Sequence, residues 1–162
     1  MVLRVALCFA VLCMALLAQR AAAASAESGT PEQIASVLLD KYVAAVNAHD
    51  TGRFGEIHAE NYIQHSGRSP NGLAAQIESF RALFARMPDV QAAVEDRIIQ
   101  GDKIVARMAF TATHTQPMQG IAPTGRRFTL RTMDIWRIEN GKFAEHWDIV
   151  DTAGLQKQLR GE

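Results

Sequence analysis

The sequence is poor in cysteine and carries no net charge. Its two cysteines, Cys8 and Cys13, both lie in the first 26 residues, which we expect to be removed during export. The remaining chain then has no thiol that could form a disulfide, ligate a metal or act as a nucleophile. Lys and Arg together number 17, as do Asp and Glu. We therefore expect no nucleic-acid partner and no electrostatic attraction to an acidic membrane.

Short motifs of several common enzyme classes are also missing. There is no Gly-Xaa-Ser-Xaa-Gly nucleophile turn, no P-loop and no Gly-Xaa-Gly-Xaa-Xaa-Gly dinucleotide motif. A zinc site needs three or four converging ligands, and the sequence has neither His-Glu-Xaa-Xaa-His nor any other paired histidine spacing. The sequence thus predicts no metal site.

Residues 1–26 have the layout of a secretory signal peptide. A short basic start, Met1-Val2-Leu3-Arg4, precedes an uncharged apolar run over residues 5–18 and an alanine-rich stretch that contains Ala24-Ser25-Ala26. The apolar run is too short to span about 30 Å of hydrocarbon comfortably as a helix, although an uncleaved anchor is the alternative. We expect cleavage after Ala24 or Ala26, export to the periplasm or the medium, and no stable membrane insertion afterwards.

The rest of the chain, residues 27–162, has the length of a single domain. Its first part is helical in pattern. Thr30 is expected to cap a helix with Pro31 in the first turn and Gln33 completing a capping box, and this helix ends near residues 47–50. A turn and a short helical piece lead to residues 62–65, a loop follows over residues 66–72, and the helical period returns until Pro88 stops it.

After Pro88 the pattern becomes extended. We expect strands over residues 90–100, 103–115, 126–139 and 142–151, with a long loop at residues 116–125 and a closing helix at 152–160. Asn140-Gly141 is the strongest hairpin signal in the chain. Helices followed by an antiparallel meander indicate an α+β fold, a curved antiparallel sheet wrapped around the N-terminal helices. Core residues or a ligand must then line the concave face.

Asp148 is the first candidate for chemistry, because it lies in the middle of an apolar strand. Burial of a carboxylate among apolar neighbours is costly and raises its pKa, which suits a general acid or base. His146 lies two residues away on the same face and is a natural partner. The alternative is a structural carboxylate, bonded to a backbone amide or an Arg at a sheet edge.

The face on which Asp134 lies depends on the register of the hairpin. A regular two-residue turn at Asn140-Gly141 pairs Asp134 with Trp147, which puts Asp134 on the side away from Asp148. A one-residue bulge reverses this assignment. Both registers are compatible with the sequence.

Other polar residues are weaker candidates. His65 precedes the glycine-rich loop, where it is either a pocket donor or a cap, and His114 has a similar but weaker claim. Most arginines are expected on solvated faces, although Arg107 or Arg131 could bind a substrate oxygen.

Four segments together resemble the SnoaL-like polyketide cyclase family, of the nuclear transport factor two-like superfamily. The resemblance extends over about residues 31–155. The segments are Tyr62-Ile63-Gln64-His65, the loop at residues 120–125, the stretch from Met133-Asp134 to Gly141, and Glu145-His146-Trp147-Asp148. It implies a cone-shaped α+β barrel, in which a curved sheet wraps around three helices and encloses a pocket.

The resemblance also implies acid–base chemistry without a metal or cofactor. Characterised cyclases of the family close a ring by intramolecular aldol condensation, in which an aspartate abstracts a proton next to a carbonyl. By its place in the motif, Asp148 would be that base, and the expected pocket partners are Asp134, His65 and His146. The pocket wall would include Tyr62, His114, Trp136 and Trp147.

Three functions remain open at this point. The first is an exported enzyme of the cyclase or isomerase type that acts on a small apolar compound. The second is a binding module of the same fold that holds such a compound unchanged. The third is a dimerisation domain, because the family pairs through its open sheet face, and a homodimer is expected in any case. Function lies in the site and not in the fold.

Overall fold

The computed structural model describes residues 29–162, so the predicted signal peptide at residues 1–26 lies outside the described residues. The described chain forms one five-stranded sheet with the strand order β1-β5-β4-β3-β2. The strands are β1 (His58–Gln64), β2 (Gln91–Gln100), β3 (Lys103–Thr113), β4 (Arg127–Glu139) and β5 (Lys142–Val150). From β2 to β5 all pairings are antiparallel, and the expected meander is confirmed.

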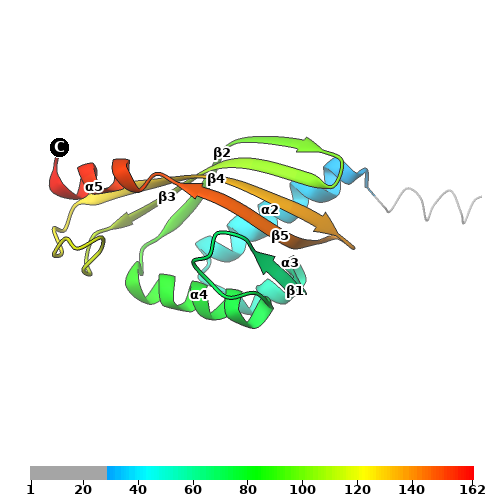
Figure 1. Cartoon of the computed structure of the whole chain (residues 1–162), viewed down its shortest axis with the longest axis horizontal. Coiled ribbons are helices and arrows are strands. Elements are labelled where there is room, and N and C mark those ends of the chain that lie inside the picture. Colours follow the sequence, from blue (N-terminus) through cyan, green and yellow to red (C-terminus); the bar gives the residue numbers. More distant parts are fainter. Residues whose placement is uncertain (1–28) are drawn as a thin grey trace, which may run out of the picture.

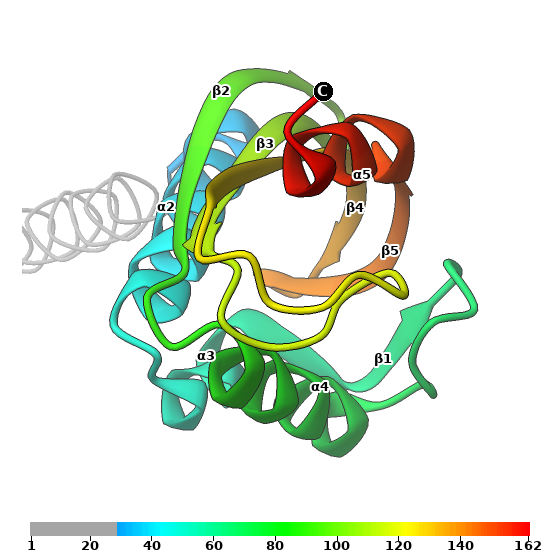
Figure 2. The same ribbon diagram turned by 90° about the vertical axis from the view of Figure 1, so that its left-hand side faces the viewer.

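The helices lie mainly on the concave side of this curved sheet (Figure 1, Figure 2). They are α2 (Pro31–Asn47), the 3-10 turn η1 (Thr51–Arg53), α3 (Phe54–Ile57), α4 (Leu73–Arg86) and α5 (Thr152–Arg160). The sheet curls around α2, while α4 lies below its open side and α5 packs on β4. This arrangement confirms the cone-shaped α+β fold. None of the helices among residues 29–162 is long and apolar enough to cross a membrane.

The start of α2 follows the local sequence closely. The Thr30 hydroxyl accepts a hydrogen bond from the Gln33 amide at 3.3 Å, and the Thr30 amide donates to Gln33 Oε1 at 2.8 Å. Pro31 occupies the first turn, where its missing N–H costs no hydrogen bond. The predicted capping box is therefore confirmed.

One element differs from the sequence-based prediction. The short helical piece ends at Ile57, and the next residues form β1, which pairs in parallel with β5 at the edge of the sheet. In this pairing Gln64 lies beside His146, although the two residues are more than 80 positions apart in the sequence. The segment has no clear alternation of apolar and polar residues, so its conformation is set by this distant pairing and not by local preference.

The core beneath the sheet is aromatic and contains a buried histidine. Tyr42, Phe54 and Phe143 surround His58, with ring centroids 5.1–6.1 Å from its imidazole. Among the described residues His58 Nε2 has no hydrogen-bond partner, and Nδ1 lies 3.4 Å from the Phe54 carbonyl oxygen. Burial lowers the pKa of His58 to about 3 and outweighs this backbone contact, which favours the charged form.

We predict that His58 makes the fold sensitive to acid. Below pH 6.5 the unfolded chain binds a proton at this histidine, while the folded protein does not until about pH 3. The free energy of unfolding should therefore fall by about 1.4 kcal/mol per pH unit in that window because of His58 alone. We expect the free energy of unfolding, measured by urea denaturation at several pH values between 7 and 5, to depend less steeply on pH in His58→Leu than in the wild type.

The control is His49→Asn, which removes a half-buried histidine at a positive φ of 53° that Asn also tolerates. Its slope should remain close to that of the wild type. An unchanged slope in His58→Leu would contradict this account of the core.

Candidate active site

A β-bulge in the last hairpin sets the geometry of the site. Asn140 and Gly141 both have positive φ, at 51° and 70°, as a tight two-residue hairpin turn requires. Next to the turn, Ile138 pairs with Phe143, but the following pair is Arg137 with Glu145. Ala144 is the extra residue, and it shifts all later pairs by one position.

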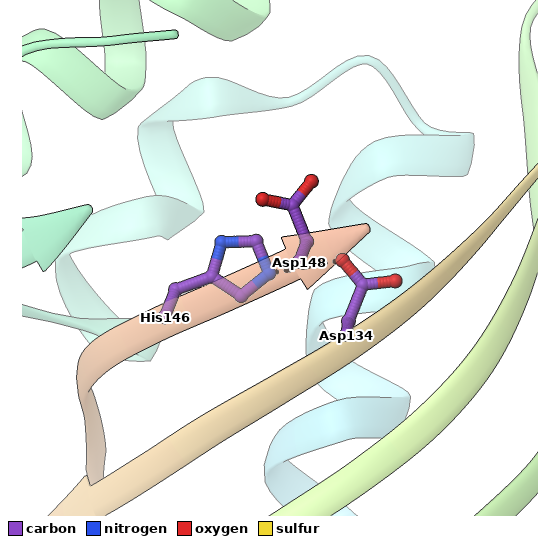
Figure 3. Close-up of side chains that lie close together, drawn as sticks. All are labelled: Asp134, His146 and Asp148. Atoms are coloured by element: carbon purple, nitrogen blue, oxygen red, sulfur yellow. Dashed lines mark hydrogen bonds and ion pairs between the residues drawn. The ribbon is translucent and has the colours of Figure 1, made fainter. Parts of the chain in front are cut away.

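Because of this shift, Asp134 lies opposite Asp148 and Trp136 lies opposite His146. The bulged register is thus the correct one of the two that the sequence left open. Asp134, His146 and Asp148 all project from the same concave face, as Figure 3 shows. Without the bulge, Asp134 would point to the outside of the sheet.

Asp134 is buried and both its oxygens are engaged. Oδ1 accepts a hydrogen bond from His146 Nε2 at 2.9 Å, and Oδ2 accepts one from the Thr132 hydroxyl. A carboxyl group that only accepts is bonded as an ionised carboxylate. Asp134 therefore holds His146 and Thr132 in place, and both of its oxygens are already occupied by these protein donors.

Gln64, on β1, assigns the tautomer of His146. Gln64 Oε1 accepts from the Ser66 backbone amide at 3.2 Å, which turns its Nε2 amide group towards His146 Nδ1 at 2.9 Å. Nδ1 is then the acceptor, and the ring proton lies on Nε2, where it is donated to Asp134. Trp136 stacks on the imidazole with a centroid distance of 4.8 Å and an interplanar angle of 10°.

Asp148 is bonded differently from Asp134. Its side chain is only 5% exposed; Oδ2 is paired with Arg68, while Oδ1 is enclosed and has no hydrogen-bond partner among the described residues. Arg68 belongs to the loop between β1 and α4, and its side chain is 53% exposed. One oxygen of Asp148 is thus paired with a half-exposed arginine, and the other has no partner among the described residues.

Three of these side chains could approach a metal ion. Asp134, His146 and Asp148 each offer a ligand atom, and these atoms lie within 4.8 Å of one another. As bonded, however, His146 presents the Nε2 proton to Asp134 and not a lone pair. A metal ligand must be the neutral, unprotonated nitrogen, so binding would require loss of the Gln64 contact. The hydrogen bonds favour a proton-transfer site over a metal site.

A cavity of about 200 Å³ opens beside this network, between the concave face of the sheet and the helices α2 and α4. Its lining is mostly apolar, with a smaller polar part around Asp148. The lining residues are Tyr42, Gln64, Ser66, Arg68, Ser69, Gln76, Ser79, Phe80, Leu83, Met87, Phe110, Leu130, Thr132, Asp134, Trp136, His146, Asp148 and Val150.

The structure brings together Asp134, His146, Asp148 and Trp136 of the residues predicted for the site. His65 and Trp147 do not line the cavity but stack on each other, with centroids 4.3 Å apart. Trp147 and Glu145 lie on the other face of β5, and His65, directly after β1, packs against them, with its Nε2 2.8 Å from the Glu145 carboxylate. Hydrogen bonds from His65 and then Arg137 lower the pKa of Glu145.

The other predicted pocket residues lie apart from the cavity lining. Tyr62 is buried behind His146 with ring centroids 6.5 Å apart, and His114 is buried against Thr124, whose hydroxyl lies 3.0 Å from Nδ1. Arg107 and Arg131 both pair with Glu95, at 2.8 and 3.4 Å, and neither lines the cavity.

The sequence reading missed several cavity residues, chiefly Gln64, Arg68, Tyr42 and Gln76. Gln64 and Arg68 reach the site through the parallel pairing of β1, for which the local sequence has no signal. Gln76 did carry a signal, because it lies three residues after Leu73, on the apolar stripe of its helix. A polar residue on such a stripe needs a partner inside the protein or in a ligand.

The fold and site define an α+β cone with a small, mostly apolar cavity and an aspartate–histidine network in its wall. The profile of SnoaL-like polyketide cyclases matches residues 36–159, and the chain belongs to this family.

Similar proteins include two named cyclases. An aklanonic acid methyl ester cyclase of Streptomyces galilaeus is 30% identical over 141 residues, which cover 79% of this chain and 90% of that protein. A nogalonic acid methyl ester cyclase of Streptomyces nogalater is 29% identical over 130 residues, covering 70% and 90%. The solved structure of TsrD from Streptomyces laurentii is 31% identical with a TM-score of 0.72, covering 78% of this chain and 95% of that one.

We predict that Asp134 is important for stability. Asp134→Ala leaves the Nε2 proton of His146 and the Thr132 hydroxyl without a buried acceptor, so the free energy of unfolding should fall by about 3 kcal/mol. Urea denaturation measures this change. Asp102→Ala removes a carboxylate that makes only an exposed contact with Lys103, and it should cost less than about 0.5 kcal/mol. Equal effects of the two substitutions would contradict the network described above.

Proposed function

We propose that the protein is a cofactor-independent acid–base enzyme of the cyclase or isomerase type, with Asp148 as the base that removes a proton next to a carbonyl of a small apolar compound. The observation that carries this proposal is the carboxylate of Asp148 in the wall of the cavity, where Oδ1 has no hydrogen-bond partner among the described residues and Oδ2 is held only by the half-exposed Arg68. A buried carboxylate oxygen without a donor is costly to maintain.

The choice of Asp148 over Asp134 follows from their hydrogen bonds. Asp134 is bonded to both His146 and Thr132, so protonation there would break existing contacts. Asp148 has one free oxygen and one that is held by Arg68 on the rim of the cavity. Because Arg68 is half-exposed on a loop, it can leave the carboxylate when a substrate enters at little cost.

The reaction also needs a donor for the enolate oxygen, and Tyr42 fits this role. It lines the cavity, and its hydroxyl makes no hydrogen bond within residues 29–162. Burial, and then the charge of Asp134 and the proximity of Tyr62, raise the pKa of Tyr42 well above its usual value. The phenol therefore stays neutral and can donate to the oxygen on which negative charge develops.

The proposed sequence of steps balances without a cofactor. Asp148 takes a proton from the carbon next to the first carbonyl, and the electron pair moves to the oxygen that faces Tyr42. In a cyclisation, the enolate carbon then attacks a second carbonyl of the same molecule, and the new alkoxide recovers the proton from Asp148. In an isomerisation, the same proton returns to a different carbon.

A binding module that leaves its ligand unchanged is the second candidate. It is supported by the same apolar cavity and by the fact that most polar groups in its wall already have partners in the protein. Turnover distinguishes the two functions, because binding alone does not exchange carbon-bound protons.

We predict that Asp148→Asn abolishes proton exchange without loss of stability. The wild type should accelerate uptake of deuterium by 2-tetralone, or by another ketone from a panel with one or two rings, as followed by proton NMR in D2O. The variant should be slower by about 100- to 10,000-fold, because the amide cannot act as a base. Its melting temperature should be equal or higher, since a buried carboxylate with one unpaired oxygen and only a half-exposed counter-ion becomes a neutral amide.

Asp102→Asn in the exposed β2–β3 turn is the matched control and should keep the wild-type rate. Wild-type exchange by Asp148→Asn would exclude Asp148 as the base. A stability loss of about 3 kcal/mol would instead identify one half of a buried ion pair. A wild type inactive towards the whole panel would favour the binding module.

We also propose that the protein is exported, on the basis of the basic, apolar and alanine-rich order of residues 1–26. With the signal peptide removed, the domain would act in the periplasm or outside the cell.

We further propose a homodimer that forms through the outer face of the sheet. Met133 and Ile149 are paired across β4 and β5 on this face, and Ile98 on β2 is also exposed. Ile149 is 76% exposed, which is unusual for a large apolar side chain within a strand. A second copy of the chain would cover these residues with the same apolar surface.

We predict that light scattering coupled to size-exclusion chromatography gives twice the chain mass at micromolar concentration. Ile149→Asp should produce a monomer, because it places a charge in the apolar contact. Val37→Asp, which adds the same charge at an exposed position on α2, should leave the dimer intact. A monomeric wild type would refute this interface.

A further inference from the structure

Gln76 is a polar residue on the buried side of α4. It is only 5% exposed, and it is the single residue of this helix that is almost completely buried. Its neighbours on the same side, Leu73, Ile77 and Phe80, pack against the main core. A glutamine at this place is not required for packing, since an apolar residue would fill the same stripe.

The side-chain amide of Gln76 makes no hydrogen bond with any residue in the range 29–162. It lines the cavity, and its polar atoms are not among those that are fully enclosed, in contrast to Asp148 Oδ1. The amide therefore retains access to the cavity space. Ser79, one turn further along α4, also lines the cavity, but its hydroxyl already donates to the Ala75 carbonyl at 2.8 Å.

An unpaired amide in a mostly apolar cavity is unfavourable until a ligand supplies its partner. The amide can donate to a carbonyl oxygen, and it can also accept from a hydroxyl. It therefore discriminates between an apolar compound that carries such an oxygen and one that does not, because the second would leave the amide desolvated and unpaired.

The size of the cavity limits the rest of the ligand. Its volume of about 200 Å³ exceeds the roughly 150 Å³ of a protein cavity that encloses benzene. The buried part of the ligand is thus a compact group of one or two rings, or an apolar chain of similar volume. The aromatic and aliphatic wall formed by Phe80, Phe110 and Leu130 suits such a group.

We propose that Gln76 is the specificity-determining residue of this cavity, where its amide pairs with a hydroxyl or carbonyl oxygen of an otherwise apolar compound of one or two rings. This inference rests on the proposed function only in taking the cavity as the ligand site, and it holds whether or not the ligand is turned over. Gln76 and Asp148 then contact the ligand from α4 and from the sheet, respectively.

The test compares the binding of 2-naphthol and naphthalene by isothermal titration calorimetry. Naphthalene is the more hydrophobic of the two, so a purely apolar cavity would prefer it. The wild type should instead bind 2-naphthol at least about 10-fold more tightly, the effect of one hydrogen bond to a buried partner. In Gln76→Leu this preference should disappear or reverse, and the melting temperature should stay the same or rise.

Two further variants make the result specific. Ser79→Ala removes a neighbouring polar group that is already bonded, and it should keep the preference. Asp102→Asn, in the exposed β2–β3 turn and outside the lining of this cavity, should also keep it. Because the assay measures binding alone, its result is separate from the loss or retention of proton exchange in Asp148→Asn. The proposal is overturned if Gln76→Leu keeps the preference, if it lowers the melting temperature by several degrees, or if neither compound binds to the wild type.

Discussion

The candidate site depends on one extra residue in the last hairpin. Ala144 has no partner in β4, and the resulting shift brings Asp134, His146 and Asp148 to the concave face. A strand has a period of two, so a slip by one residue would exchange the inner and outer faces of β4 relative to β5. The outward residues of the same strands then include Trp147, Met133 and Ile149, of which Met133 and Ile149 are exposed, whereas the two aspartates and His146 lie on the enclosed face.

Given this register, the two aspartates acquire different environments. Asp134 lies deep in the sheet and is fully bonded to His146 and Thr132, whereas Asp148 lies at the cavity wall with one oxygen unpaired. The difference does not come from the residue type but from the donors around each carboxylate. In acid–base sites, two carboxylates acquire separate roles when their environments differ in this way: one is fixed by hydrogen bonds within the protein, and the other can still exchange a proton with a substrate.

Much of the fold could be predicted from the sequence because its signals are local. The capping box at Thr30, the stop at Pro88 and the Asn140-Gly141 turn each act within a few residues, and each is found where it was expected. The edge strand β1 could not be predicted, because its pairing with β5 joins residues more than 80 positions apart. Gln64 and Arg68 enter the site through that strand and the loop after it, so they were missed with it.

The register of the last hairpin also could not be predicted from the sequence, although both alternatives, the regular and the bulged pairing, could be stated. Neither the turn nor the alternation of apolar residues reveals a bulge at Ala144, because an alanine fits either face. Because the register was unknown, His65 and Trp147 were wrongly predicted to lie in the pocket. Both belong to the family-like segments, yet they stack on the outer face of the sheet.

The central claim is the register-dependent hydrogen-bond network in which His146 donates its Nε2 proton to Asp134 and accepts at Nδ1 from Gln64. Nitrogen-15 NMR of the imidazole rings in the mature protein tests it directly, with His146 assigned by substitution. The account predicts a neutral His146 protonated at Nε2, whose proton exchanges slowly because it is buried against Asp134. A proton on Nδ1, or an Nε2 proton that exchanges freely with water, would contradict the network and with it the separate roles of the two aspartates.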